Sequence, residues 1–315
     1  MLPNNYYSYI SKRSSLILLY HATFSNSPDD LKVGLHNVKP DIIFEQLGAL
    51  SESYKFVTLE EWFQNQGKPG IAAITFDDGY KSVLYETLPI LVELNMPATI
   101  FINGCTLKGE VIWRDKIRYL INLGLVEDFL NWVPYDCSIK EINPENFYFK
   151  TKKNINSKEV SDLIATYFQI NNIKLNQYCV DDWKQLIDHP LITYGNHTLN
   201  HYVLSTLSYE QQYFEIKENE RILNDIGVNT SKIFSVPFGA KDDFNEHTLD
   251  ICSQLSYKGI LLSRNRLNRN LIAQNSISYG ERFIVPSSVD RLITRTYKIF
   301  VKSFIYSSGL KFTTR

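Results

Sequence analysis

Short apolar runs alternate along the chain with segments whose apolar residues recur at helical spacing. The runs end at turn-forming residues, which is typical of buried strands. Helical periodicity predicts helices over 41–50, 82–94 and 208–226, and Ser208 and Gln211 stand at capping-box spacing at the start of the last one. This alternation predicts an α/β fold in which helices cover a mainly parallel sheet. The predicted strands are 16–20, 71–76, 98–102, 191–194, 233–236, 258–262 and 282–285.

One long segment interrupts the alternation. Residues 104–189 are polar, rich in Asn and Lys around 140–157, and show helical patterns only at 115–122 and 157–169. We interpret the segment as an insertion over one face of the barrel and not as a separate domain. A length of 315 residues suits one α/β barrel. We therefore predict a single domain over 1–315, with its core at about 15–290.

The segment at about 289–307 is basic and amphipathic, with Arg291, Arg295 and Lys298 spaced among apolar residues. We favour a terminal helix packed on the barrel. The same pattern also suits a helix that lies on an anionic membrane surface. The sequence thus predicts a C-terminal helix and keeps peripheral membrane contact as an alternative.

Composition narrows the classes of protein to consider. Hydrophobic residues make up 44% of the chain and charged residues 21%, as in ordinary globular proteins. The net charge of −1 gives no reason to expect a nucleic-acid partner. The 4 cysteines are scattered and predict neither a disulfide framework nor a zinc knuckle. No segment has the pattern of a signal peptide or a membrane span. We expect a cytoplasmic location, with the inner membrane face as a peripheral alternative.

Two adjacent carboxylates follow the predicted strand at 71–76. Asp77 and Asp78 stand there in the run T-F-D-D-G at 75–79. Asp-Asp-Gly is also common in solvated turns, which is the simpler interpretation of this motif alone. Two neighbouring carboxylates at a strand end nevertheless repel each other unless a cation or a proton lies between them.

Two histidines follow the predicted strand at 191–194. His197 and His201 are spaced to share one face of a helical turn and can bind one metal ion. Together with Asp78 they offer two nitrogens and a carboxylate oxygen, which leaves positions open for water and substrate. Asp77 is then free to act as a base on that water.

The two motifs resemble those of the polysaccharide deacetylase family, the NodB-type carbohydrate esterases. The family's T-F-D-D-G matches 75–79, and its H-[ST]-x-x-H matches 197–201. The resemblance covers roughly 15–290 and implies a deformed (β/α)7-type barrel with helices outside.

The resemblance also implies roles for these residues. Asp77 is expected to be the general base, and the backbone N–H of Tyr80 is expected to stabilise an oxyanion. The expected ligands of a divalent metal, with zinc as the expected ion, are Asp78, His197 and His201.

The third family motif, R-x-P-[FY]-G, is matched only in part. Ser235 stands where the family has an arginine that orients and tunes the catalytic Asp. Arg282 and Arg114 are candidate substitutes for it. The residues expected to form a wall of the substrate groove are Pro237, Phe238 and Gly239.

The fifth family motif, L-x-H, supplies a general acid. It has no match near the C-terminus, but Leu19 and His21 match it at the end of the first predicted strand. Some family members are circularly permuted, with this motif at the front and without the third-motif arginine, and the chain resembles that subgroup. We expect His21 to protonate the leaving amine, with a buried structural histidine as the alternative.

These motifs share one structural context that does not depend on the family. His21, Asp77, His197 and the run 237–239 all stand just after predicted strands. The carboxyl ends of parallel barrel strands face the same way. The sequence therefore predicts that these residues meet at one mouth of the barrel.

The predicted activity is the metal-dependent removal of an N-acetyl group from a sugar during surface-glycan or polysaccharide biosynthesis. The expected partner is an acetylated sugar or glycan, and lipid-linked and nucleotide-linked sugars are among the candidates. Two alternatives stay open. One is a deacylase for an O-acetyl or N-formyl group, and the other is a non-catalytic carbohydrate-binding module on the same scaffold.

Overall fold

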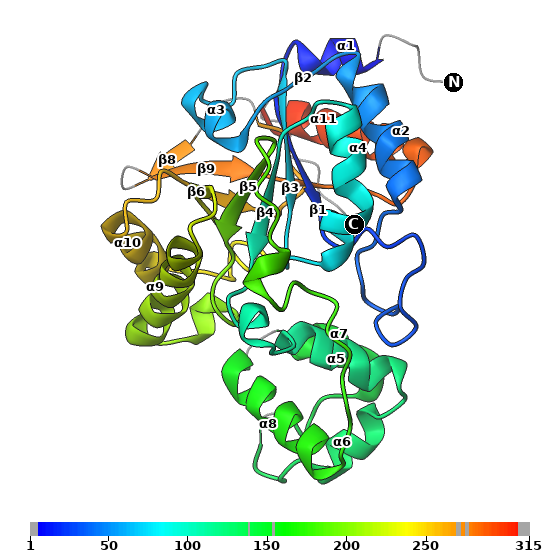
Figure 1. The fold of residues 1–315 in the computed structure, drawn as a ribbon, viewed down its shortest axis with the longest axis vertical. Coiled ribbons are helices and arrows are strands. Elements are labelled where there is room, and N and C mark those ends of the chain that lie inside the picture. The colour runs from blue at the N-terminus through cyan, green and yellow to red at the C-terminus, as the bar shows by residue number, and fades with distance from the viewer. Residues whose placement is uncertain (1–5, 138, 153–154, 269–271, 275–276, 308–315) are drawn as a thin grey trace.

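The structure of the protein is a computed structural model that describes residues 6–137, 139–152, 155–268, 272–274 and 277–307. The strands among these residues form one sheet (Figure 1). Within these residues the strand order is β10-β1-β3-β4-β5-β6-β7-β9-β8, with β2 beside β3. All pairs are parallel except β8 with β9. The bounds are β1 (Leu16–Tyr20), β2 (Lys55–Phe56), β3 (Ile71–Phe76), β4 (Ala98–Ile102), β5 (Ile192–Asn196), β6 (Thr230–Ser235), β7 (Gly259–Leu262), β8 (Ile272–Gln274), β9 (Ile277–Glu281) and β10 (Phe283–Ile284).

The two edges of the parallel sheet meet at Arg282. The backbone N–H of Arg282 donates to Leu262 on β7, whereas the N–H of Val285 donates to Leu19 on β1. The chain thus crosses from one edge to the other between β9 and β10, which together act as one bent strand. The result is the nearly closed, deformed (β/α)7-type barrel that the sequence predicts. The strand predicted at 282–285 is present in shortened form as β10, because the ladder changes partner at Arg282, and β9 before it was not predicted.

The barrel interior is filled at the end where the strands begin. A separate apolar cluster combines inward-facing strand residues such as Ile17, Ala73 and Phe101 with Trp62 and Phe63 of helix α3 (Leu59–Gln64). Helix α3 therefore closes this end, opposite the helices of residues 113–170 in Figure 1. Only the other end of the barrel is left for a site.

Helices cover the outside of the barrel, and a larger apolar core lies between them and the sheet. Helix α9 (Tyr209–Ile226) has the predicted capping box and ends at Gly227, whose φ of 79° suits glycine. The helix predicted at 82–94 begins with a π-helical turn, η1 (Val83–Thr87), before α4. The other bounds are α1 (Tyr6–Ser11), α2 (Pro40–Ser51), α4 (Leu88–Glu93) and α10 (Glu246–Gln254).

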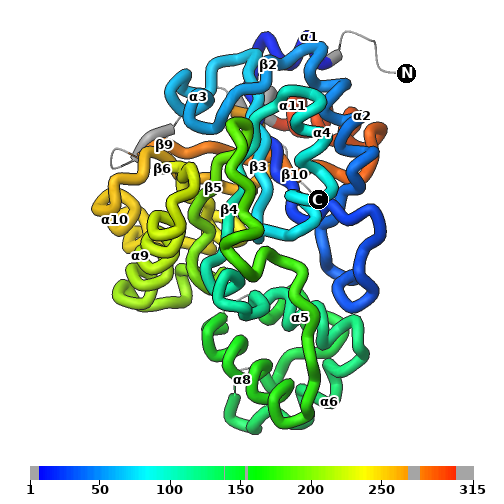
Figure 2. The backbone as a smooth tube through the Cα atoms, in the orientation of Figure 1, coloured from blue at the N-terminus to red at the C-terminus, as the bar shows by residue number. Residues whose placement is uncertain are grey.

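The predicted insertion forms a helical cluster beyond the carboxyl ends of the strands (Figure 2). Its anchors reach the motif residues, since the Trp113 indole donates to the carbonyl of His201 at 2.7 Å and the Tyr80 hydroxyl donates to Asp115 at 2.8 Å. The cluster therefore covers the mouth of the barrel. Its helices are α5 (Trp113–Asn122), α6 (Val126–Trp132), α7 (Phe147–Lys150) and α8 (Ser157–Ile170).

The C-terminal helix α11 (Val289–Ser307) agrees with the predicted segment. It buries Leu292, Thr296 and Phe300 and leaves Arg291 and Lys298 exposed. The helix thus packs on the barrel as favoured, and membrane contact stays a prediction. Among the described helices, none combines the length and the apolar character that crossing a bilayer requires. The ends of the predicted domain, at 1–5 and 308–315, lie outside the described residues.

Candidate active site

The polar residues of the site continue the inward-facing rows of the barrel strands. Successive strand residues alternate between the two faces of a sheet, so every second residue points into the barrel. The hydrophobic cluster and the close approaches of two glycines identify the inward rows. Five site residues extend them: His21 after Ile17, Asp77 after Ala73, His197 after Gly195, Ser235 after Ile233 and Arg282 after Gly280. The predicted convergence at one mouth of the barrel is confirmed.

Asp78 comes to the site through a strained turn. Its φ is 70° and that of Gly79 is 68°, so the chain leaves β3 through the left-handed region. The turn is fixed because the N–H of Val180 donates to Gly79 and the N–H of Lys81 donates to Tyr178. A side chain at Gly79 would meet Ile102 at 2.7 Å. The left-handed φ is therefore the main reason for a glycine in the first motif, and the close approach of the Ile102 side chain adds to it.

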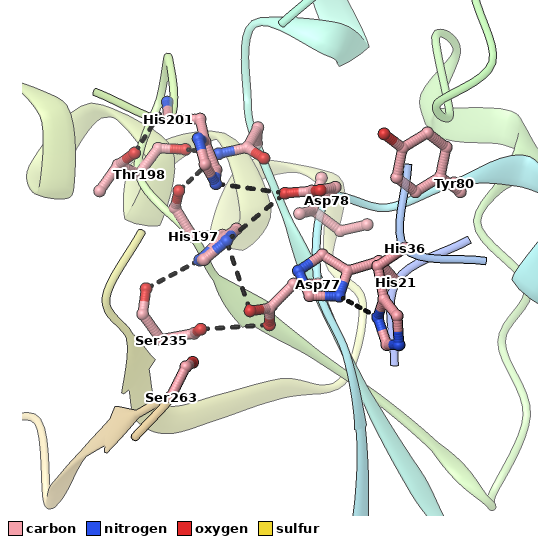
Figure 3. A network of polar contacts seen from close by, with 12 residues as sticks. His21, His36, Asp77, Asp78, Tyr80, His197, Thr198, His201, Ser235 and Ser263 are labelled. Carbon is pink, nitrogen blue, oxygen red and sulfur yellow. Dashed lines mark hydrogen bonds and ion pairs between the residues drawn. The ribbon is translucent and has the colours of Figure 1, made fainter. Parts of the chain in front are cut away.

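Three potential ligand atoms of Asp78, His197 and His201 lie within 4.8 Å of one another, and all three side chains are buried (Figure 3). Asp78 Oδ1 is 3.6 Å from His197 Nε2 and 3.3 Å from His201 Nε2. Neither Asp78 Oδ1 nor His197 Nε2 has a hydrogen-bond partner among the described residues. Buried atoms of this kind are costly without a partner. The donor set and its unsatisfied atoms therefore fit a divalent cation.

The tautomer of His197 is set by a neighbouring strand. Its Nδ1 donates to the carbonyl of Ser235 at 2.8 Å, because a carbonyl oxygen can only accept. The neutral ring then has its lone pair on Nε2, which faces Asp78. Burial lowers the pKa of His197, so the neutral form needed for ligation is favoured. Ser235 thus serves the metal site through its backbone.

Two asparagines that stand directly after β4 and at the end of β5 hold the histidine loop. Thr198 and His201 have φ values of 65° and 61°, which are strained for residues with a side chain. The Asn103 amide donates to the carbonyls of His197 and Thr198, and Asn196 accepts from the N–H of Thr198. The ligand geometry is therefore over-determined by buried hydrogen bonds.

Asp77 is held by the replacement for the missing third-motif arginine. Arg282 donates from Nη1 to Asp77 Oδ1 at 2.7 Å, and the Ser235 hydroxyl donates to the same oxygen at 3.1 Å. Burial raises the pKa of Asp77, but Arg282 and His197 outweigh it and hold the pKa at about 2. Of the two candidate substitutes, Arg282 makes this contact. Arg114 is directed into the insertion instead, where it bonds Thr151 and Tyr148.

The pKa of the neighbouring Asp78 is shifted in the opposite direction. Burial raises its pKa to about 8, Arg118 opposes this shift, and the Asp77 carboxylate adds to it. The metal-free site therefore holds a proton on Asp78 at neutral pH and an ionised Asp77. A bound cation would have to displace that proton.

His21 stands beside Asp77 and is paired with a second histidine. Asp77 N–H donates to the carbonyl of Tyr20 at 3.0 Å, which sets His21 level with Asp77. His21 Nδ1 lies 3.0 Å from His36 Nδ1. Burial lowers the pKa of His21 well below its usual value. Unlike the metal-site residues, His21 is only half-buried.

The third-motif run forms a wall next to the histidines. The Phe238 ring lies 4.8 Å from the His201 ring and packs edge-on to Trp113. Phe238 is half-buried, whereas Pro237 and Gly239 are buried. Gly239 is required here, because its φ is 71° and a Cβ would lie 2.7 Å from the backbone nitrogen of Ser263.

Comparison with protein families decides the relationship. The sequence profile described as polysaccharide deacetylase matches residues 64–122 and 150–260 of the chain. The chain belongs to the polysaccharide deacetylase family. A search among curated proteins found no match. The gap in the profile match falls within the insertion, which is where the family resemblance of the sequence is weakest.

Three solved structures share the fold. The Streptococcus pyogenes deacetylase PplD in complex with acetate has a TM-score of 0.54 at 19% identity and covers 91% of this chain and 97% of its own. IcaB from Ammonifex degensii has a TM-score of 0.55 at 16% identity, with coverage of 90% and 97%. A de-N-acetylase from Aggregatibacter actinomycetemcomitans has a TM-score of 0.53 at 15% identity, with coverage of 87% and 95%. At these identities the three comparisons show that the chain shares their fold, and they show nothing further about it.

Sequence reasoning missed several residues that support the site. His36 and the Tyr80–Asp115–Arg118 network were not singled out, although Arg118 donates to both Tyr80 and Asp115. His36 lies in a loop without a motif, and no spacing in the sequence links it to His21. Contacts of this kind depend on which loops fold over the barrel mouth.

The affinity of the deacetylase for zinc should depend on the proton held by Asp78. Below about pH 8 a cation must displace one proton, so we expect the association constant to rise by about one decade per pH unit from about pH 6 to 7.5 and then to level off. Isothermal titration calorimetry of the metal-free protein measures this. Glu215→Gln is the matched control, because it removes another buried carboxylate close to the site. Burial raises the pKa of Glu215 to about 7, and its carboxylate accepts a hydrogen bond from Asn200 in the histidine loop. Affinity independent of pH in this range would contradict the assignment.

The ion pair of Arg282 with Asp77 should contribute strongly to folding stability. Arg282→Met leaves the buried Asp77 carboxylate without its counter-charge, so we expect a loss of about 3–5 kcal/mol in the free energy of unfolding. Urea denaturation measures the loss, and Arg264→Met, at the partly exposed pair with Glu281, should cost under about 1 kcal/mol. Adding Asp77→Asn to Arg282→Met should recover part of the stability. Additive effects of the two changes would show that the pair is not coupled.

Proposed function

We propose that the protein is a divalent-metal-dependent hydrolase that removes an N-acetyl group from a sugar. The observation that carries the proposal is the buried cluster of Asp78, His197 and His201 directly beside an ionised Asp77. Asp78, His197 and His201 would hold a divalent cation, with zinc as the expected ion, and that cation would supply a Lewis acid able to polarise the acyl carbonyl and to lower the pKa of water. The rest of the proposed chemistry belongs to the protein's own residues.

Asp77 acts as the general base through Oδ2. Its Oδ1 is occupied by Arg282 and Ser235, whereas Oδ2 lies 3.6 Å from His197 Nε2 and faces the ligand cluster. A carboxylate with a pKa of about 2 is a weak base. It can take a proton only from a water that is itself made acidic, so the base and the metal site depend on each other.

The remaining proposed roles follow the protons and the electron pair through the reaction. Water forms a bond to the carbonyl carbon and gives a proton to Asp77. The backbone N–H of Tyr80 stabilises the oxyanion. The C–N bond then breaks and its electron pair goes to nitrogen. His21 passes to that nitrogen, through Nε2, the proton that Asp77 took from the water, and acetate leaves. Half-buried His21 is placed to reach a substrate.

An amide substrate is favoured over an ester by the presence of this acid. An amine is a poor leaving group unless it is protonated, so a histidine at the mouth is most valuable for N-deacetylation. The de-N-acetylase among the similar structures agrees with this choice. Phe238, beside His201, and its neighbours Pro237 and Gly239 are proposed to form the wall against which the sugar binds.

The finer assignment is a lipid-linked or nucleotide-linked sugar in surface-glycan assembly. It rests on the basic residues Arg291, Arg295 and Lys298, which line a shallow groove next to Pro286. Pro286 follows Val285, which contacts His36 at the barrel mouth. A phosphate attached to the sugar would therefore meet positive charge near the site.

Product analysis tests the activity directly. Zinc-loaded protein incubated with N-acetylated sugars, free and nucleotide-linked, should release acetate and an equal amount of new primary amine. Acetate without amine would indicate an O-acetyl esterase, and formate would indicate a deformylase. Sugar binding without any product would support the binding-module alternative.

Asp77→Asn separates the chemistry from metal binding. The variant keeps the shape of the side chain and all three proposed ligands but loses the base, so we expect kcat to fall by about 10²–10⁴-fold with zinc still bound. Asp78→Asn is the matched variant and should lose zinc itself. Metal content by mass spectrometry and steady-state kinetics give the two readouts. Wild-type turnover by metal-loaded Asp77→Asn would overturn the role of Asp77.

A further inference from the structure

His36 meets His21 because the loop between them is closed at its base. The N–H of Ala22 donates to His36, and the N–H of Val38 donates back to Ala22. The Asn37 side chain accepts from the N–H of Phe24 and donates to its carbonyl. The loop thus returns beside β1 directly after His21. Figure 3 shows the two histidine rings in contact next to Asp77.

Hydrogen-bond accounting fixes the protons of this pair. His36 Nε2 lies 2.7 Å from the carbonyl oxygen of Val285, which can only accept, so His36 Nε2 bears the hydrogen. In a neutral ring the other nitrogen, His36 Nδ1, must then be an acceptor. His21 Nδ1 is 3.0 Å from it and must therefore be the donor. When both rings are neutral, the only assignment that satisfies both contacts places opposite tautomers on them.

We propose that His36 is a positioning residue that holds His21 as the Nδ1–H tautomer and leaves His21 Nε2 for the proton exchanged with the substrate. The inference rests on the proposed function, in which His21 is the acid. The two ring nitrogens of His21 point in different directions, so a bond from Nδ1 to His36 directs Nε2 away from that loop. Without His36 the ring could rotate or adopt the other tautomer.

The arrangement works in both protonation states of His21. Its Nδ1–H donates to His36 whether or not Nε2 carries a proton, so the bond persists through the reaction. Burial lowers the pKa of His36, which favours the neutral ring that can accept. The charged groups that act on the pair are Asp77, Arg282, Arg118 and, for His36, Arg295. The three arginines oppose a positive charge on the pair, whereas Asp77 and, for His36, the hydrogen bond to Val285 favour one.

The acceptor of His36 belongs to the strand that closes the barrel. Val285 follows β10, and its N–H donates to Leu19 on β1, two residues before His21. The carbonyl that fixes His36 and the strand that carries His21 are thus joined by one hydrogen-bonded ladder. Pre-organisation of this kind lowers the entropic cost of placing an acid.

Long-range proton–nitrogen correlation spectra of histidine-labelled, zinc-loaded protein test the tautomers. The chain has 6 histidines, so single substitutions assign each ring. Above the pKa of both rings we expect hydrogen on His21 Nδ1 and on His36 Nε2. Hydrogen on His21 Nε2 in the neutral state would overturn the proposal. The spectrum needs no substrate, so it tests the tautomers even if the protein shows no deacetylase activity.

Three substitutions of His36 test the consequence for turnover. In His36→Asn the carboxamide oxygen replaces the Nδ1 acceptor, whereas His36→Gln places its polar end nearer the Nε2 position and His36→Phe has no acceptor. We expect kcat to fall by about 10–100-fold in the Gln and Phe variants, with KM and zinc content unchanged, and the Asn variant to stay within a few-fold of wild type. Exposed His247 in α10 provides the control His247→Asn.

A purely structural role for His36 gives a different pattern. The three variants would then lose activity in step with their loss of unfolding free energy, and Asn would not rescue turnover. That result would overturn the proposal even if the variants fold poorly, because thermal unfolding is measured on the same samples. Absence of activity in the wild type would instead count against the proposed function alone.

Discussion

The hydrogen-bonded ion pair between Arg282 and Asp77 joins the closure of the barrel to its chemistry. Arg282 is the residue at which the chain leaves the β7 edge and moves to the β1 edge. Its side chain is fully buried and enters the barrel at the level of the motif residues. A buried guanidinium is tolerated only with a counter-charge, and Asp77 provides it. The same contact keeps Asp77 ionised. Fold closure and the proposed base therefore depend on one interaction.

That contact also separates two adjacent carboxylates into different states. Asp77 has Arg282 and the Ser235 hydroxyl, whereas Asp78 has two histidine nitrogens that burial keeps neutral. The pKa values of about 2 and about 8 follow from these surroundings and not from the residue type. One carboxylate can act as a base and the other as a ligand. Adjacent positions in the sequence thus receive different proposed roles.

The insertion is part of the site and does more than cover it. Trp113 bonds the backbone of His201 and packs on Phe238, and Asp115 bonds the Tyr80 hydroxyl. These contacts reach the second and third motifs and the turn that carries Asp78. Buried hydrogen bonds of this kind rigidify the residues that they connect. The insertion therefore positions the most recognisable residues of the chain, and it does so through residues that lie inside the profile match.

The sequence by itself determined the fold class, most strands of the barrel and the residues of the candidate ligand cluster, because each depends on local patterns. Alternating apolar runs gave β1, β3 and β4 with their observed bounds, and T-F-D-D-G and H-T-L-N-H placed Asp78, His197 and His201 after strands. Only the tertiary structure decided that Arg282, and not Arg114, pairs with Asp77, and that His36 faces His21. These partners are 205 and 15 residues apart and share no motif. Long-range pairing depends on how loops and closing strands pack, and a single sequence carries no periodic signal for it.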